Sequence, residues 1–175
     1  MQVHRVDDRA IELAVSQSFQ VFKRAKKHLD VMTFRTSREI PAPPSSVFAA
    51  FEDRTSLEIW WGPAGFTNTF ETCEFKPGGR WSYVMHAPNG KDIPNESVFR
   101  EIEPCKRILI QHESKPRYLL TVTLELTDNG GTRVQWEQEF ENPKVAGAIK
   151  HIVEPANEQN LDRLSAEVLR KHGGG

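Results

Sequence analysis

Two titratable side chains, Glu96 and His112, are the strongest candidates for chemistry in this sequence. Both fall in segments of alternating polarity, and the pairing of successive hairpins predicts that both point to the same, mostly apolar face of a sheet. A carboxylate near an imidazole in apolar surroundings is typical of an acid/base pair, because burial shifts both pKa values. The same pair is also typical of a ligand anchor or of a structural ion pair. The residues alone leave these three interpretations open.

The predicted register depends on the turns between the strands. Asn89-Gly90 favours a two-residue type I′ hairpin turn. Such a turn sets Tyr83 opposite Glu96 and Trp81 opposite Val98, so that Glu96 shares the face of the two rings.

The later hairpins continue the same alternation. Pro104 favours a longer loop built on a type I turn, which sets Ile102 opposite Ile108 and Val98 opposite His112. The strands that follow then pair His112 with Tyr118, Leu120 with Gln138, and Val122 with Trp136. The predicted ligand-contacting set is Trp81, Tyr83, Met85, Glu96, Val98, Arg100, Ile110, His112, Tyr118, Leu120, Trp136 and Gln138, with Asn157 from the C-terminal helix.

Other motifs for chemistry are missing from the sequence, so no metal and no cofactor are expected. The six histidines are scattered, without paired metal-ligand spacing, and Cys73 and Cys105 are too far apart for a Cys-x-x-Cys site. There is no Gly-x-Ser-x-Gly nucleophile elbow, and the glycine clusters lack the Lys-Ser/Thr ending of a phosphate-binding loop.

The elements that position these residues begin with an edge strand over residues 33–40, which is stopped by prolines. Ser45 or Ser46 then caps a short helix. A second short helix carries Trp60-Trp61 and ends at Gly62-Pro63.

The rest of the chain predicts an antiparallel sheet followed by a long helix. Residues 69–140 alternate in polarity between turn signals, which gives about six or seven strands with one buried face. Residues 142–170 return to helical spacing, with one broad apolar stripe that the sheet would cover. The fold class is therefore α+β.

The predicted domain organisation is a helical extension over 1–33, one domain over 34–170, and a disordered tail over 171–175. The extension has apolar residues at helix-like spacing. It is either a docking or dimerisation helix, which would make a homodimer, or a loosely packed arm.

Composition narrows the partners and the compartment. The 23 Lys and Arg residues balance 24 Asp and Glu, which gives no reason to expect nucleic acid or an anionic membrane surface. Two cysteines are too few for a disulfide framework, and no segment reaches membrane-spanning length or has the pattern of a signal peptide. A cytoplasmic protein without membrane insertion is expected.

Three motifs together resemble the AHSA-like family, which is named for its likeness to a domain of a heat-shock chaperone ATPase activator. They are Trp60-Trp61-Gly62-Pro63-Ala64-Gly65-Phe66, Pro77-Gly78-Gly79 and Leu161-Asp162-Arg163-Leu164. The resemblance covers roughly residues 34–170 and implies the helix-grip fold of the START-like (SRPBCC) superfamily. In that fold a curved antiparallel sheet wraps a long C-terminal helix around an apolar cavity. The superfamily hosts carriers, cyclases and chaperone cofactors alike.

One departure from the family pattern bears on function. Relatives often carry Gly-Trp where this chain has Ala156-Asn157, so a small amide replaces a ring and leaves room beside the sheet. The leading hypothesis is therefore a protein that binds a small hydrophobic or amphipathic molecule between sheet and helix. The alternatives are a cyclase- or hydrolase-like enzyme that uses Glu96 and His112, and an interaction module like the chaperone ATPase activators.

Overall fold

The computed structural model describes residues 32–173. The predicted extension over 1–33, apart from its last two residues, lies outside the described residues. The described elements are β1 (Met32–Ile40), α2 (Pro44–Glu52), α3 (Arg54–Trp60), β2 (Thr67–Cys73), β3 (Arg80–His86), β4 (Asp92–Glu103), β5 (Arg107–His112), β6 (Tyr118–Leu126), β7 (Thr132–Phe140) and α4 (Pro143–His172).

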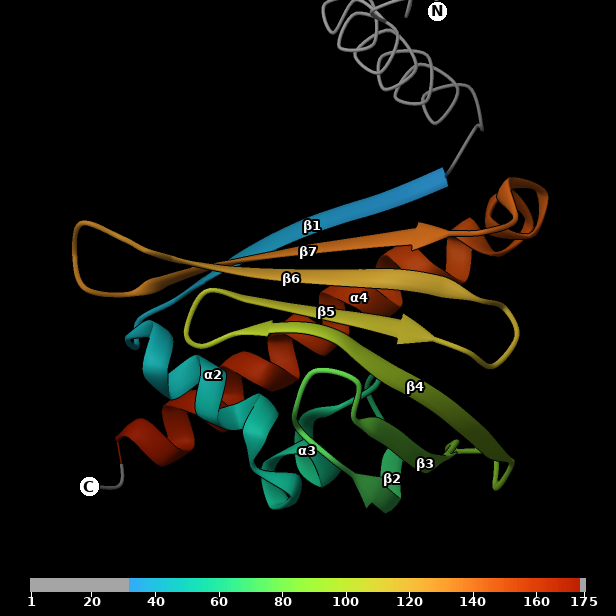
Figure 1. The fold of residues 1–175 in the computed structure, drawn as a ribbon, viewed down its shortest axis with the longest axis horizontal. Helices are drawn as coiled ribbons and strands as arrows, with labels where there is room; N and C mark the ends of the chain where they lie inside the picture. Colours follow the sequence, from blue (N-terminus) through green and yellow to red (C-terminus); the bar gives the residue numbers. More distant parts are fainter. Residues whose placement is uncertain (1–31, 174–175) are drawn as a thin grey trace, which may run out of the picture. The chain divides into compact units, whose positions relative to one another are not determined.

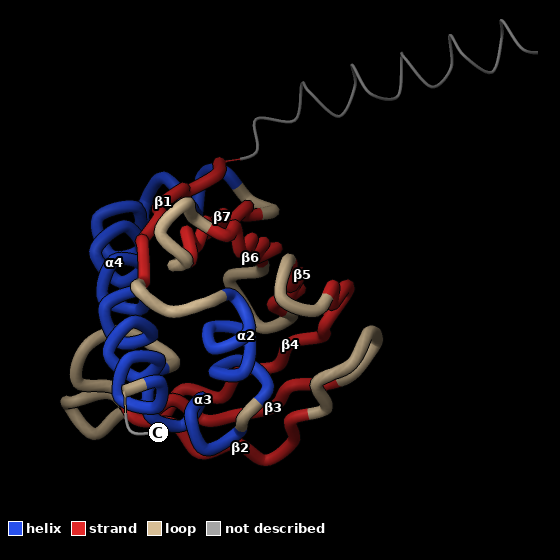
Figure 2. Tube along the Cα trace, turned by 90° about the vertical axis from the view of Figure 1, so that its left-hand side faces the viewer, coloured by secondary structure: helices blue, strands red, loops and turns tan. Residues whose placement is uncertain are grey.

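The strands form one antiparallel sheet of seven strands in the order β1-β7-β6-β5-β4-β3-β2. Helix α4 runs obliquely behind this sheet (Figure 1). Figure 2 shows the strands bending into an arc, with α2 inside the arc and α4 across its open side. This arrangement confirms the predicted α+β helix-grip fold.

The two short helices begin and end at residues with clear local roles. Helix α2 starts at Pro44 without a side-chain N-cap, so the predicted capping by Ser45 or Ser46 is wrong, and both serines lie inside the helix. Proline suits the first helical position because its φ is already helical and its missing N–H would have had no partner there. Asp53 follows α2 and caps α3 by accepting a hydrogen bond from the backbone N–H of Thr55 at 3.1 Å.

Helix α4 is capped by Asn142. The Asn142 side-chain oxygen accepts hydrogen bonds from the backbone N–H groups of Lys144 and Val145 at 3.0 and 3.2 Å. The helix continues to His172, so Lys171 and His172, which were expected in the tail, are helical.

The β3–β4 hairpin has a three-residue loop in place of the predicted two-residue turn. His86 pairs with Asp92, and the backbone N–H of Ala87 donates to the carbonyl of Lys91 at 2.9 Å. Gly90 has a φ of +83°, the left-handed conformation that ends a type I turn in loops of this length.

This extra loop residue shifts β4 by one position against β3. Tyr83 pairs with Asn95 and Trp81 pairs with Ser97, so both predicted pairs in this hairpin are wrong. Because side chains alternate along a strand, the shift moves Glu96 to the outer face of the sheet.

A bulge at Arg100 then reverses the shift. Before the bulge Ser97 lies opposite His112, so the predicted Val98–His112 pair is wrong. After the bulge the predicted pairs are confirmed: Ile102 with Ile108, His112 with Tyr118, Leu120 with Gln138, and Val122 with Trp136.

Aromatic rings fill much of the space between the sheet and the helices. The ring of Trp61 lies between those of Trp81 and Trp136, with centroid distances of 4.5 and 5.8 Å. The Trp61 indole N–H also donates to the hydroxyl of Tyr83 at 2.9 Å. We call this group the aromatic cluster; it consists of Trp60, Trp61, Phe70, Trp81, Tyr83, Phe99 and Trp136, all at most 5% exposed.

Arg163 explains why two of the sequence motifs occur together. Its guanidinium donates to the main-chain carbonyls of Gly62, Pro63 and Phe66 at 2.9, 2.8 and 2.9 Å. The side chain of Asn160, one turn earlier, accepts from the backbone N–H of Gly62 at 2.7 Å. The Leu-Asp-Arg-Leu turn of α4 thus fixes the Trp-Trp-Gly-Pro-Ala-Gly-Phe loop, which carries Trp61 into the aromatic cluster.

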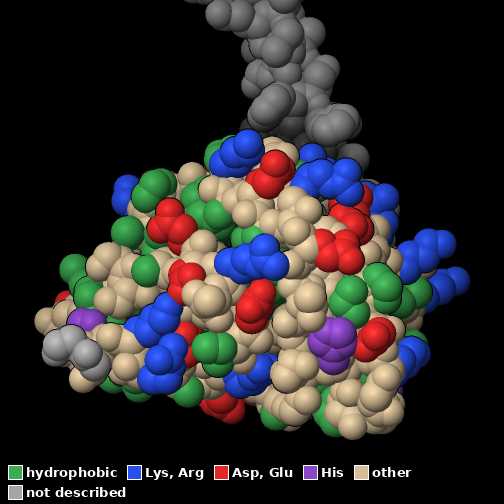
Figure 3. Space-filling model, turned by 90° about the horizontal axis from the view of Figure 1, so that it is seen from below, with side chains coloured by type: hydrophobic (Ala, Val, Ile, Leu, Met, Phe, Trp, Pro, Cys, Tyr) green, Lys and Arg blue, Asp and Glu red, His purple; other side chains and the backbone are tan. Residues whose placement is uncertain are grey.

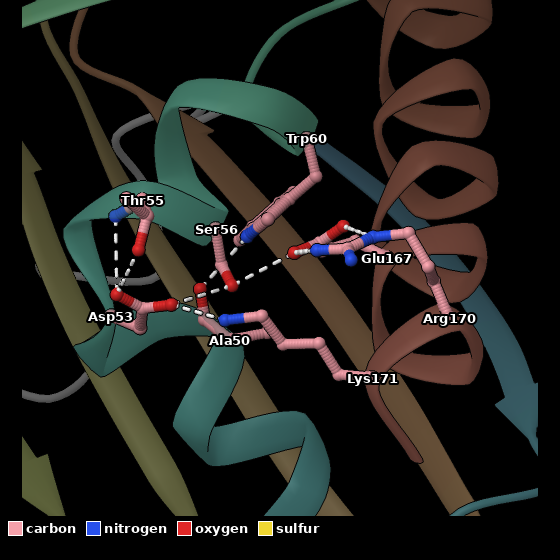
Figure 4. A network of polar contacts seen from close by, with 8 residues as sticks. All are labelled: Ala50, Asp53, Thr55, Ser56, Trp60, Glu167, Arg170 and Lys171. Atoms are coloured by element: carbon pink, nitrogen blue, oxygen red, sulfur yellow. Dashed lines mark hydrogen bonds and ion pairs between the residues drawn. The ribbon is translucent and has the colours of Figure 1, made fainter. Parts of the chain in front are cut away.

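A second network joins the short helices to the C-terminal end of α4 (Figure 4). Glu167 is 2% exposed and accepts hydrogen bonds from Ser56 at 2.9 Å and from Arg170 at 2.8 and 2.9 Å. Burial by itself would raise the pKa of Glu167, but the bonds from Arg170 and Ser56 hold it below its usual value. Lys171 pairs with Asp53, which is also the N-cap of α3. The network therefore has a structural role.

The outer surface carries ion pairs between neighbouring strands. Arg35 pairs with Glu137 at 2.9 Å, and Arg133 pairs with Glu39 at 2.7 Å. On the side seen in Figure 3, basic and acidic side chains are intermixed and apolar atoms occur in small groups. Exposed pairs of this kind contribute little stability, so the fold depends mainly on the interior.

Candidate functional site

Buried polar side chains collect at one end of the inner face of the sheet. This end is formed by the first half of β4, the end of β5, the start of β6 and the end of β7, which are successive neighbours in the sheet. We call it the polar end; its members are Asn95, Ser97, His112 and Gln138 on the strands and Asn157 on α4, each at most 8% exposed.

His112 lies in the middle of the polar end. Its Nε2 faces the side-chain oxygen of Asn95 at 3.0 Å, and its Nδ1 faces the carbonyl of Pro116 at 3.2 Å. The ring of Tyr118 stacks on the imidazole, with centroids 4.4 Å apart and an interplanar angle of 6°. Burial lowers the pKa of His112, although backbone hydrogen bonds at Pro116 oppose this. The imidazole is therefore neutral at neutral pH.

Gln138 and Asn157 connect the sheet to α4 across the interior. The Asn157 amide donates to the Gln138 side-chain oxygen at 3.0 Å. Burial raises the pKa of the neighbouring Tyr118 hydroxyl, an effect that a hydrogen bond with Gln138 partly offsets. Asn157 is thus buried in the interior. This is the location expected for a position at which relatives often carry a tryptophan.

The predicted pairing of Glu96 with His112 does not form. Glu96 lies on the outer face, where its side chain is 46% exposed and bonded to Ser82 at 2.7 Å and Arg80 at 3.0 Å. Those two bonds, that from Ser82 first, lower the pKa of Glu96. The residue beside His112 is instead Asn95, the neighbour of Glu96 in the chain, because the longer β3–β4 loop shifts the strand.

Val98 and Arg100 also leave the predicted site. Val98 follows Glu96 to the outer face and is half-buried there. Arg100 is the bulged residue, and its exposed side chain pairs with Glu113 at 3.2 Å. The observed register and bulge therefore leave neither of the two charged residues of the predicted ligand-contacting set, Glu96 and Arg100, on the inner face.

The other predicted residues lie on the inner face, but most of them pack against one another. Tyr118 and Met85 are half-buried, and Met85 lies close to Gly62. The fully packed members are Trp81, Tyr83, Ile110, Leu120 and Trp136, each at most 2% exposed.

Sequence reasoning missed Asn95, Ser97 and Phe140. Asn95 and Ser97 were assigned to the outer face by the same one-residue error. Phe140 could have been found, because it lies two residues beyond Gln138 on the face already assigned correctly.

A pocket of about 500 Å³ opens beside the polar end. Its floor includes Phe140, whose ring lies 5.2 Å from that of Tyr118, the ring stacked on His112. The pocket is bordered by the β5–β6 loop and the β7–α4 junction, through Lys115, Pro116, Arg117, Phe140, Glu141, Asn142 and Val145. An apolar group bound there would be separated from the polar end by only Phe140 and Tyr118.

A chain of hydrogen bonds on the outer face has the order of a hydrolase triad. Thr69 Oγ1 lies 2.9 Å from His86 Nε2, and His86 Nδ1 lies 2.6 Å from Asp92 Oδ1. However, Thr69 is exposed and the Asp92 side chain is 65% exposed. Fixed hydrogen-bond donors and dipoles stabilise the charge of a transition state mainly in sites that exclude water. Because these side chains are exposed to water, we assign this chain of bonds no catalytic role.

Within residues 32–173, no group of three or more His, Cys, Asp or Glu side chains is placed to hold a metal ion. Nor does the described part of the chain contain a helix that is both long and apolar enough to cross a membrane.

The model of the family described as Activator of Hsp90 ATPase homolog 1-like protein matches residues 41–168. The chain belongs to this family. The match includes the three motifs on which the resemblance was based and both ends of the contact between Arg163 and the 59–66 loop.

Solved structures agree with the fold. A solution structure of a protein from Arthrobacter aurescens is 25% identical, with a TM-score of 0.73, covering 81% of this chain and 92% of that one. A crystal structure from Nitrosomonas europaea is 20% identical, with a TM-score of 0.73, covering 82% and 97%. An AHSA1 protein from Silicibacter pomeroyi is 20% identical, with a TM-score of 0.65, covering 81% and 100%. No curated protein matches the sequence.

Proposed function

We propose that this protein binds a small hydrophobic or amphipathic molecule between the end of the sheet and helix α4. The observation that carries the proposal is the pocket of about 500 Å³ beside a buried polar end. Its volume falls within the range of small-molecule sites, and it combines apolar walls with a few polar groups, as such sites do. The apolar part of the ligand would contact Phe140, Val145 and Pro116.

Burial of the polar end supports the same function. Asn95, His112, Gln138 and Asn157 contribute less to stability than apolar side chains of similar size would, because burying a polar group has a desolvation cost. Polar groups that lower stability and lie next to a pocket are typical of a binding region. The enzymatic alternative loses its support, because it required Glu96 beside His112.

Titration of the full chain with N-phenyl-1-naphthylamine, an uncharged fluorescent probe, tests the proposal. We expect saturable binding at one site per chain. Val145→Trp should fill the pocket and weaken binding about tenfold or more, because the added ring occupies the space of the ligand. Ile152→Trp is the matched control, since it adds the same ring to an exposed position of the same helix.

The proposal fails if the probe does not saturate, or if Val145→Trp and Ile152→Trp bind it as tightly as the unaltered chain does. Circular dichroism of both variants shows whether the fold is retained. Equal weakening in both variants also counts against the pocket, because Ile152 does not border it.

A further inference from the structure

We infer that the ligand is an amphipathic anion whose head group lies at the rim of the pocket, beside Lys115 and Asn142. This inference rests on the proposed binding function and specifies the class of its ligand. It follows from the balance of charge among the residues that line the pocket and from the hydrogen-bond donors that have no partner there.

The pocket combines an apolar floor with a polar rim. Phe140 is 2% exposed, and Pro116 and Val145 also line the pocket. The remaining lining side chains are polar and exposed; they are those of Lys115, Arg117, Glu141 and Asn142. A molecule that fills this pocket would place its apolar part against the floor and keep its head group at the rim, in contact with water.

Two of the charged residues that line the pocket already form ion pairs. Arg117 pairs with Glu113 at 2.6 Å and with Glu141 at 3.4 Å, and Glu113 also pairs with Arg100 at 3.2 Å. These two arginines and two glutamates balance one another in charge. Neither Arg117 nor Glu141 is therefore a free counter-charge for a ligand.

Lys115 carries the charge that remains unbalanced at the rim. Among residues 32–173, no carboxylate lies within ion-pair distance of its ammonium group, and its side chain is exposed in the β5–β6 loop. The lining of the pocket thus has an excess of positive charge. Such an excess attracts an anionic head group and repels a cationic one.

The start of helix α4 adds a potential of the same sign. Asn142 and Val145 line the pocket, and the first turn of the helix has no acidic side chain. The backbone N–H groups of Lys144 and Val145 already donate to the Asn142 side-chain oxygen at 3.0 and 3.2 Å, so they are not available to a ligand. The helix therefore contributes a favourable field for an anion rather than hydrogen bonds from these two groups.

Asn142 provides a second hydrogen-bond donor at the rim. Because its side-chain oxygen caps α4, the orientation of the amide is fixed, and its NH₂ group has no acceptor in the described part of the chain. The Lys115 ammonium and the Asn142 amide thus lack partners, and both are donors. A carboxylate can accept from both, whereas an ammonium head group can accept from neither.

Three compounds with the same alkyl chain and different head groups test the inference. We would measure displacement of N-phenyl-1-naphthylamine from the full chain at pH 8 by decanoate, 1-decanol and decylamine, below the concentrations at which they form micelles. Decanoate should bind about threefold more tightly than 1-decanol, because an ion pair at an exposed rim contributes modestly, and decylamine should bind most weakly. The preference for decanoate should shrink between about 20 mM and about 500 mM salt.

Lys115→Gln tests the residue at the centre of the inference. It removes the charge and keeps much of the apolar stem, so decanoate should bind about threefold more weakly while 1-decanol binding changes less than about twofold. Lys91→Gln is the matched control, because Lys91 is exposed in the β3–β4 loop and the substitution changes the net charge equally. It should leave the binding of both compounds unchanged.

Asn142→Asp reverses the charge preference without removing the helix cap. Aspartate caps a helix about as well as asparagine, so α4 should still begin at Pro143. The new carboxylate would repel decanoate and attract decylamine, so the preference between these two compounds should reverse. Circular dichroism of the variant shows whether the helix is retained.

If 1-decanol or decylamine binds as tightly as decanoate, the inference is wrong while the proposed function stands. Equal effects of Lys115→Gln and Lys91→Gln on decanoate would also overturn it, as would an equal loss of decanoate and 1-decanol binding in Lys115→Gln. Failure of all three compounds to displace a saturably bound probe likewise counts against it. Failure of the probe itself to bind, or its insensitivity to Val145→Trp, overturns the proposed function instead.

Discussion

The aromatic cluster and the polar end share one sheet surface but are built in opposite ways. In the aromatic cluster, rings from β3 and β7 flank Trp61, and rings from β2 and β4 stack on Trp81. Arg163 holds the loop that carries Trp61. At the polar end, single hydrogen bonds join amides to an imidazole and to one another. Large rings exclude water and stabilise the fold. Buried amides add little stability but can recognise a ligand.

The difference indicates a division of roles along the inner face. The short helices and the aromatic cluster maintain the fold, whereas the side where α4 begins leaves a pocket open. We therefore expect substitutions in the aromatic cluster to change stability strongly. Substitutions at the polar end should change stability less, and ligand binding more.

The largest effect is expected for Trp61→Ala. Removing the ring between Trp81 and Trp136 leaves a cavity and should lower the free energy of unfolding by about 3–5 kcal/mol. Urea denaturation followed by circular dichroism measures this. Ile59→Ala, on the exposed side of α3, is the control and should change stability by less than about 0.5 kcal/mol. Similar losses in the two variants would contradict the assigned role of Trp61.

Leu120→Ala tests the boundary between the two regions, because Leu120 is 1% exposed and pairs with Gln138. The expected loss is about 2–5 kcal/mol if the leucine is closely packed. Leu126→Ala, at the exposed end of the same strand, should have little effect. If Leu120→Ala also lowers the free energy of unfolding by less than about 0.5 kcal/mol, Leu120 does not lie on the interior face of β6.

At the polar end, a double-mutant cycle on Gln138 and Asn157 should give a smaller effect. Gln138→Leu leaves the Asn157 amide unpaired and should lower the free energy of unfolding by about 1–3 kcal/mol. The double variant with Asn157→Leu should recover part of this loss, because the Asn157 amide is no longer left unpaired. If thermal denaturation shows that the losses of stability in the two single variants simply add in the double variant, the two side chains contact each other without a stabilising hydrogen bond.

The smallest effect is the pH dependence due to His112. Because burial lowers its pKa in the folded state, the unfolded chain binds more protons near its ordinary pKa. Its neutral form therefore favours folding above about pH 6.5, and this contribution falls as the pH drops below that value.

Comparing the unaltered chain with His112→Gln between pH 8 and pH 5 measures this term. The stability advantage of the unaltered chain should shrink toward low pH. An advantage that grows toward low pH would mean that the imidazolium is favoured in the folded state, by the two oxygens that face its ring nitrogens.

About half of the polar end was predictable from the sequence. His112 and Gln138 were placed inside correctly, because the pairs predicted across β5, β6 and β7 are the observed ones. Asn157 was placed inside by the resemblance to relatives that often carry a ring at its position. Asn95 and Ser97 were missed, and Glu96 took their place. The pocket itself could not be predicted, because it depends on how the β5–β6 loop and the start of α4 meet.

The sequence by itself determined the order of strands and helices, the family and the apolar face of β5 to β7. Only the tertiary structure decided that the β3–β4 loop has three residues and that β4 bulges at Arg100. Asn-Gly is compatible with either loop length, so the choice depends on which face of β4 packs better against the rest of the fold. Because side chains alternate with a period of two, one loop residue turned Glu96 outward and brought Asn95 to His112.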